Sequence, residues 1–181
     1  EILTRQLQVF STGSASLDFA LGGGIEEGSM IEISGLPKVG KSSLLIQSLV
    51  SYQQAGRKCF YVDAENRFCE KNTQIHGLDI NKLSLISSQQ DKILDANDTL
   101  DLIETIMRSE KGCAIVLDSC SSLCSRERAT SKVDAHRRDS KPKLFSDWIS
   151  GISPIIRVNN ISLFVIRHLM VNQGQGQKYT S

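Results

Sequence analysis

The sequence predicts an α/β fold in which a mostly parallel central sheet is flanked by helices. Short apolar segments alternate along the chain with longer segments whose apolar residues recur at helical spacing. One short segment, residues 113–117 (CAIVL), shows no polar alternation, as expected for a strand that is covered on both faces. Strands that alternate with helices favour parallel pairing through right-handed crossovers. The length of 181 residues fits one domain, since domains average ~100–200 residues.

The strands are the short apolar runs, and they are expected at residues 30–34, 58–62, 83–87, 113–117 and 161–166. The helices fall between them, and they are expected at residues 43–54, 70–76, 98–110 and 144–158. In the third helix, Leu102, Ile103, Ile106 and Met107 recur at helical spacing and define a buried face. The last helix contains Pro154, so we expect an interruption there.

The composition excludes several classes of protein. A hydrophobic fraction of 40% and a charged fraction of 23% are typical of a globular domain. No apolar run approaches the ~20 residues of a membrane helix, so we expect no membrane partner and a cytoplasmic location, or the host cytoplasm if the gene is carried by a phage. The five cysteines contain no CxxC pair, which favours reduced thiols over disulfides or a zinc site.

A glycine-bearing loop follows the first strand. Residues 35–42 (GLPKVGKS) match the pattern G-x-x-x-x-G-K-[ST], between an apolar strand and a helix-forming stretch. Glycines let the backbone wrap around phosphate oxygens, and the following helix presents its positive end to the anion. Lys41 would reach the outer phosphates, and the Ser42 hydroxyl would complete a Mg²⁺ shell. The predicted ATP-binding residues are Gly35, Leu36, Pro37, Lys38, Val39, Gly40, Lys41, Ser42 and Ser43.

Acidic residues end two other strands, and a histidine follows a third. Asp118 stands where a P-loop protein has its second metal-supporting acid, although a cap after a strand is the alternative. Glu65 is a candidate base for activating water, or an exposed loop acid. His168 could bond the γ-phosphate, or it could be structural. The carboxyl ends of parallel strands form one edge, where ligands bind.

A long polar segment without periodicity precedes the last helix. Residues 126–143 hold seven Lys/Arg and three acids, a local net charge of +4, whereas the whole chain carries +1. Basic loops suit phosphate backbones, and a solvated loop of mixed charge is the alternative.

Several segments together resemble one family. Residues 11–22 (STGSASLDFALG) resemble the stretch that opens the ATPase core of RecA-type recombinases. Residues 61–65 (YVDAE) resemble the strand with the family's glutamate, residues 76–83 the segment that follows it, and residues 115–119 (IVLDS) its Walker B strand. The resemblance spans about residue 8 to residue 170, with features of both the phage UvsX branch and the archaeal RadA branch.

The resemblance implies a RecA-like P-loop ATPase core with assigned roles. Lys41 and Ser42 would bind phosphate and Mg²⁺, Asp118 would support the metal, and Glu65 would activate water. His168, where the family commonly has glutamine, would sense the γ-phosphate. The resemblance also implies DNA-binding loops near residues 125–138 and from about residue 170, with contacts expected from Arg126, Arg128, Lys132, Arg137, Arg138 and Lys178. The implied partners are single- and double-stranded DNA and further copies of the chain in a helical filament.

Some positions depart from the family. Asn72 stands where RecA has the tyrosine that stacks on adenine, so recognition of the adenine would either be looser or use Phe68. Arg167 replaces a small amide beside the sensor. We expect residues 1–181 to be a fragment that lacks an N-terminal polymerisation element and the strands after the second loop. A cation supplied by a neighbouring subunit is worth ~10³–10⁵ in rate, so the fragment alone should hydrolyse ATP poorly.

Three functions are therefore open. The first is a DNA-dependent ATPase that forms filaments on single-stranded DNA and promotes homologous pairing. The second is a non-catalytic, nucleotide-binding paralogue that acts as a mediator for another recombinase. The third is a hexameric, helicase-like ATPase on the same core.

Overall fold

The computed structural model describes residues 7–88, 95–123, 141–171 and 179–180. Its centre is a parallel sheet with the strand order β3-β7-β6-β4-β5. The strands are β3 (Met30–Gly35), β4 (Cys59–Asp63), β5 (Leu83–Ser87), β6 (Ala114–Asp118) and β7 (Ser162–His168). The α/β fold and all five expected strands are therefore confirmed.

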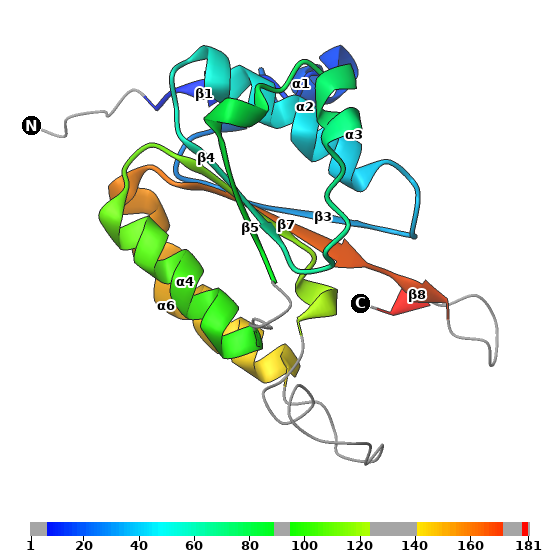
Figure 1. The fold of residues 1–181 in the computed structure, drawn as a ribbon. Coiled ribbons are helices and arrows are strands. Elements are labelled where there is room, and N and C mark those ends of the chain that lie inside the picture. Colours follow the sequence, from blue (N-terminus) through cyan, green and yellow to red (C-terminus); the bar gives the residue numbers. More distant parts are fainter. Residues whose placement is uncertain (1–6, 89–94, 124–140, 172–178, 181) are drawn as a thin grey trace, which may run out of the picture.

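Helices cover both faces of the sheet (Figure 1). On one side lie α1 (Ala15–Ala20), α2 (Lys41–Gln54) and α3 (Glu70–Ile75), and on the other lie α4 (Ala96–Ser109) and α6 (Lys141–Asn159). The chain moves outward from β3 to β5 with helices on the first face, then returns through β6 to β7 with helices on the second. This change of face is what right-handed crossovers require when the direction of strand addition reverses.

Short elements complete the described part of the chain. They are β1 (Val9–Phe10), β2 (Ile25–Glu26), β8 (Met170–Val171), β9 (Tyr179–Thr180) and the 3-10 helices η1 (Ile80–Lys82) and η2 (Cys120–Ser122). None of the helices in the described segments is both long and apolar enough to cross a bilayer.

The two central strands are buried on both faces, as the unbroken apolar sequence of β6 predicts. In β6, Ile115 and Leu117 pack with α4 and α6, whereas Ala114 and Val116 pack against α2 on the other face. In β7, Phe164 is 0% exposed and its ring meets the ring of Tyr52 edge-on at 5.9 Å. Side chains alternate between the faces of a strand, so one strand contributes to both cores.

Most element boundaries shift by one to three residues from the sequence-based predictions, and three differences have a clear structural meaning. Helix α4 begins before residue 98, because the Asp95 side chain caps it by accepting a hydrogen bond from the Asp98 backbone N–H. Pro154 does not interrupt α6, which is continuous from Lys141 to Asn159. Strand β7 continues past residue 166, because Arg167 and His168 still pair with β3. His168 therefore ends the strand itself rather than following it.

The stretch before β3 is anchored on α2. The Ser48 and Ser51 hydroxyls donate to the backbone oxygens of Thr12 and Ser11 at 3.3 and 2.8 Å. Asp18 accepts hydrogen bonds from the Thr12 backbone N–H and hydroxyl at 2.8 and 2.6 Å. The polar groups of residues 11–18 thus hold the start of the chain in place, through hydrogen bonds among themselves and to α2.

Candidate nucleotide-binding and hydrolysis site

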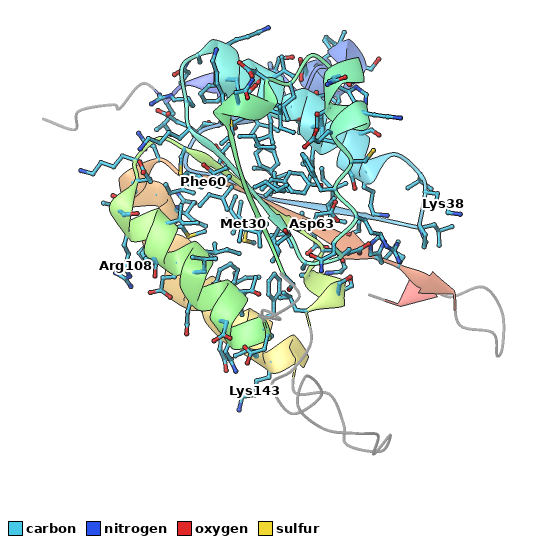
Figure 2. The ribbon with its side chains drawn as sticks, viewed as in Figure 1. Met30, Lys38, Phe60, Asp63, Arg108 and Lys143 are labelled. Carbon is cyan, nitrogen blue, oxygen red and sulfur yellow. The ribbon has the colours of Figure 1, made fainter. Side chains whose placement is uncertain are left out.

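A cavity of about 450 Å³ lies where four strands end. Figure 2 shows Lys38 in the loop after β3 and Asp63 at the end of β4, both toward the edge of the sheet at which the parallel strands end. The cavity is lined by residues of that loop and α2, of β4 and the loop after it, and of the ends of β6 and β7: Pro37, Lys38, Gly40, Lys41, Ser42, Ser43, Ile46, Tyr61, Asp63, Glu65, Arg67, Phe68, Cys69, Asp118 and His168. Strand ends that are far apart in sequence thus meet at one place.

The loop between β3 and α2 needs its glycines. Gly40 caps α2 in the left-handed region at φ 93°, and Gly35 leaves room for the loop, because an added Cβ there would lie 3.2 Å from Val39 Cγ2. Lys38 also has a positive φ of 64°. The 14-residue α2 begins directly at Lys41, so its positive end faces the cavity. This arrangement suits a phosphate group.

Lys41 is held inside the loop. Its side chain is 7% exposed, and Nζ donates to the carbonyl oxygens of Gly35 at 3.1 Å and Leu36 at 2.7 Å. Both partners are neutral, so these contacts position the ammonium group without neutralising it. A positive charge in so enclosed a place favours an anionic ligand.

Ser42, in the first turn of α2, meets Asp118 at the end of β6. The Ser42 hydroxyl donates to Asp118 Oδ2 at 2.7 Å, and the Tyr61 hydroxyl donates to the same oxygen at 2.6 Å. Asp118 is 8% exposed at the end of β6. The two predicted metal ligands are therefore adjacent, and their oxygens are of the hard kind that Mg²⁺ prefers.

Glu65 lies at the centre of a hydrogen-bond cluster. Its Oε1 accepts hydrogen bonds from the Ser119 and Ser122 hydroxyls, both at 2.8 Å, and lies 2.6 Å from His168 Nε2. Burial raises the pKa of Glu65, but the hydrogen bonds from Ser119, Ser122 and His168 together outweigh it, so the pKa lies below its ordinary value. The carboxylate is thus ionised at neutral pH and cannot donate, so His168 Nε2 carries the proton of their shared bond.

This cluster predicts a pH effect for Ser122→Ala. The variant loses one hydrogen bond that lowers the pKa of Glu65, so that pKa should rise toward its ordinary value. Because the pKa of Glu65 is depressed in the folded state, its ionised form stabilises the folded protein at pH values above the pKa of an ordinary glutamate. This stabilisation is lost as the pH falls through the pKa of the folded state. If Glu65 is the base for ATP hydrolysis, as the sequence predicts, the rise in its pKa should also move the acidic limb of kcat/KM to higher pH. Ser150→Ala, which removes an exposed hydroxyl bonded to the Ser146 carbonyl in α6, should leave the profile unchanged. An unmoved limb in Ser122→Ala would contradict the assignment of Glu65 as the titrating base.

Comparison with known proteins identifies the family. The model of the RecA N-terminal domain matches residues 2–175 of this chain. The chain belongs to the RecA family. It is 29% identical over 171 residues to protein RecA of Delftia acidovorans, covering 94% of this chain and 45% of that protein. It is 32% identical over 162 residues to protein RecA of Chloroherpeton thalassium, covering 88% and 44%.

A eukaryotic relative shows the same extent of similarity. The mitochondrial DNA repair protein recA homolog of Dictyostelium discoideum is 27% identical over 172 residues, covering 94% of this chain and 37% of that protein. The chain therefore spans less than half the length of these relatives, and it corresponds to the N-terminal domain of the RecA family.

One departure from the RecA pattern now has a physical account. Arg167 Nη2 lies 3.1 Å from Glu32 Oε2, and both residues belong to the paired strands β7 and β3. The Ser34 hydroxyl donates to the other oxygen of Glu32 at 2.6 Å. Arg167 thus forms an ion pair at the edge of the sheet beside the cavity.

Asp63 and Phe68 lie close to Glu65 but have different roles. Asp63 is 4% exposed, and its two oxygens accept the backbone N–H groups of Glu65 and Phe68 at 3.2 and 2.7 Å. It therefore organises the turn that carries Glu65. Phe68 lines the cavity, so it remains a candidate for contact with the adenine ring of a nucleotide. The side chain of Asn72 lies outside what the structure describes.

The predicted DNA contacts cannot be placed, whereas three side chains that were not predicted join the site. All six predicted DNA contacts lie outside the described residues: Arg126, Arg128, Lys132, Arg137, Arg138 and Lys178. In contrast, Tyr61, Ser119 and Ser122 join the site without having been predicted. Two serines that follow a strand and a tyrosine within a strand carry no specific signal in a single sequence.

Proposed function

We propose that this chain is the ATP-binding and hydrolysing core of a DNA-dependent ATPase that assembles on single-stranded DNA and promotes homologous pairing and strand exchange. The observation that supports it most is the meeting of Lys41, Ser42, Asp118, Glu65 and His168 around one cavity. These residues come from α2 and from the ends or following turns of β4, β6 and β7.

The residues fit a magnesium nucleotide. A ligand atom from each of Glu65, Asp118 and His168 lies within 4.8 Å of the other two. Because His168 Nε2 already bonds Glu65, we assign Mg²⁺ to the oxygens of Ser42 and Asp118, the latter directly or through water. Bound Mg²⁺ would neutralise charge on the phosphates.

Each residue then has a role in hydrolysis. Lys41 and the backbone N–H groups of the loop between β3 and α2 would bind and orient the phosphates, and Ser42 and Asp118 would hold the metal. The ionised Glu65 accepts a hydrogen bond from the attacking water and takes up its proton. His168 donates to Glu65 without nucleotide, and it donates to the γ-phosphate when that group arrives, so it reports the presence of the phosphate to the chain that follows β7.

Binding to DNA is proposed from the family and from the basic segment 126–143. Contacts to the phosphate backbone should make the affinity fall with salt, at a slope near −0.7 per neutralised phosphate on single strands. Assembly into a filament and a cytoplasmic location are proposals of the same kind.

ATP hydrolysis with and without single-stranded DNA tests the function. We expect the full-length natural protein to be stimulated by DNA, and we expect the stimulation to disappear in Glu65→Gln. Hydrolysis that is indifferent to DNA would favour a hexameric ring, which subunit counting on DNA would identify. Nucleotide binding without any turnover would favour the non-catalytic paralogue.

A further inference from the structure

Tyr61 is a buried tyrosine that the roles described above leave unused. It lies in the middle of β4 and is 2% exposed. Its ring meets the ring of Phe68 edge-on, with centroids 5.0 Å apart, and its hydroxyl reaches across to β6. A phenylalanine would fill the same apolar space, so the packing does not explain the hydroxyl.

The hydroxyl makes a specific contact. It donates to Asp118 Oδ2 at 2.6 Å, and the Ser42 hydroxyl donates to the same oxygen at 2.7 Å. A phenol carries its proton at neutral pH, so it donates this hydrogen bond and the carboxylate oxygen accepts it. Within the described residues, no donor is found at Asp118 Oδ1.

We propose that Tyr61 is a positioning residue for the magnesium site, holding Asp118 Oδ2 so that Oδ1 is presented to the metal or to its bound water. This inference rests on the proposed function. Partners that orient a metal-binding carboxylate restrict its rotation before the metal arrives, and their loss typically lowers metal affinity ~10–100-fold. A short hydrogen bond from a neutral phenol also holds the carboxylate oxygen without adding a competing charge.

The test is the Mg²⁺ dependence of ADP binding to the full-length protein, for wild type and Tyr61→Phe. The affinity for ADP in excess EDTA should be unchanged in the variant, because the Tyr61 hydroxyl donates its one proton to Asp118 and the phosphate loop keeps Lys41 and its backbone N–H groups. The half-saturating Mg²⁺ concentration for the metal-dependent gain in affinity should rise about tenfold.

Tyr52→Phe is the matched control. Tyr52 is also buried in the core between the sheet and α2, but among the described residues its hydroxyl makes no hydrogen bond to Asp118 or to a side chain that lines the cavity. Removal of the Tyr52 hydroxyl should leave the half-saturating Mg²⁺ concentration unchanged. A double-mutant cycle combines Tyr61→Phe with Asp118→Asn. Because Tyr61 acts through Asp118, Tyr61→Phe should not raise the half-saturating Mg²⁺ concentration further when Asp118 is already replaced.

The outcomes separate the two claims. Wild-type protein that binds no ADP with Mg²⁺ would overturn the proposed function and this inference with it. Wild-type binding with a Tyr61→Phe curve that overlays it would overturn the inference alone. Loss of folding in Tyr61→Phe, seen in the melting temperature, would also overturn it, since the hydroxyl would then be structural.

Discussion

Glu65→Gln should lower kcat for ATP hydrolysis by ~10²–10⁴-fold, the usual contribution of a positioned general base. The ionised carboxylate is able to take a proton from water, whereas an amide of the same shape is not. Binding of the magnesium nucleotide should stay near the wild-type affinity, because Glu65 contacts Ser119, Ser122, His168 and Arg67 rather than Lys41 or Ser42. Single-turnover hydrolysis and a separate binding titration measure the two quantities.

A control for Glu65→Gln is available on the other side of the sheet. Glu104→Gln makes the same chemical change on α4, where Glu104 pairs with Arg108 one helical turn away. It should leave both kcat and nucleotide affinity unchanged. Equal rates for Glu65→Gln and wild type would show that another group activates the water, and the mechanism would have to be reassigned.

Phe164→Ala should lower the free energy of unfolding by ~3–5 kcal/mol, the usual cost of truncating a buried phenylalanine. The ring is 0% exposed in the central strand β7, where it packs in the core between the sheet and α2. The neighbouring backbone is fixed by pairing with both β3 and β6, so the cavity left behind has little means of closing. Denaturant unfolding followed by circular dichroism gives the difference in stability.

Phe19→Ala is the matched control for this second change. Phe19 is 90% exposed on α1, so its truncation should alter the free energy of unfolding by no more than ~0.5 kcal/mol. A large loss at Phe19, or a small one at Phe164, would show that the burial of these two rings is assigned wrongly.

The parts of the site that could be predicted are those with a local cause. The loop from Gly35 to Ser42 has a fixed spacing, because a backbone that encloses a phosphate needs glycine, lysine and a hydroxyl at set positions. The sequence predicts that Asp118 and Glu65 lie at one edge of the sheet because each follows an apolar strand and parallel strands end at one edge, and both line the cavity there. The bond between Ser42 and Asp118 agrees with their expected placement, while their metal role stays a prediction.

The parts that could not be predicted depend on contacts between distant segments. Tyr61 and Asp118 are 57 residues apart, and so are Glu65 and Ser122. Nothing near Tyr61 in the sequence indicates that its hydroxyl meets a carboxylate, since the apolar pattern of β4 reports only that the strand is buried.

The sequence by itself determined the alternating fold, the glycine-bearing loop after β3 and the edge of the sheet at which we expect a ligand, because these follow from periodicity, glycine spacing and the direction of parallel strands. Only the tertiary structure decided which side chains share an oxygen at that edge. The strand order β3-β7-β6-β4-β5 places β4 beside β6 and β7 beside β3. The pairing of Asp63 with Asp118 and of Gly35 with His168 then sets the distances between side chains, and such a register is fixed by packing across the whole sheet.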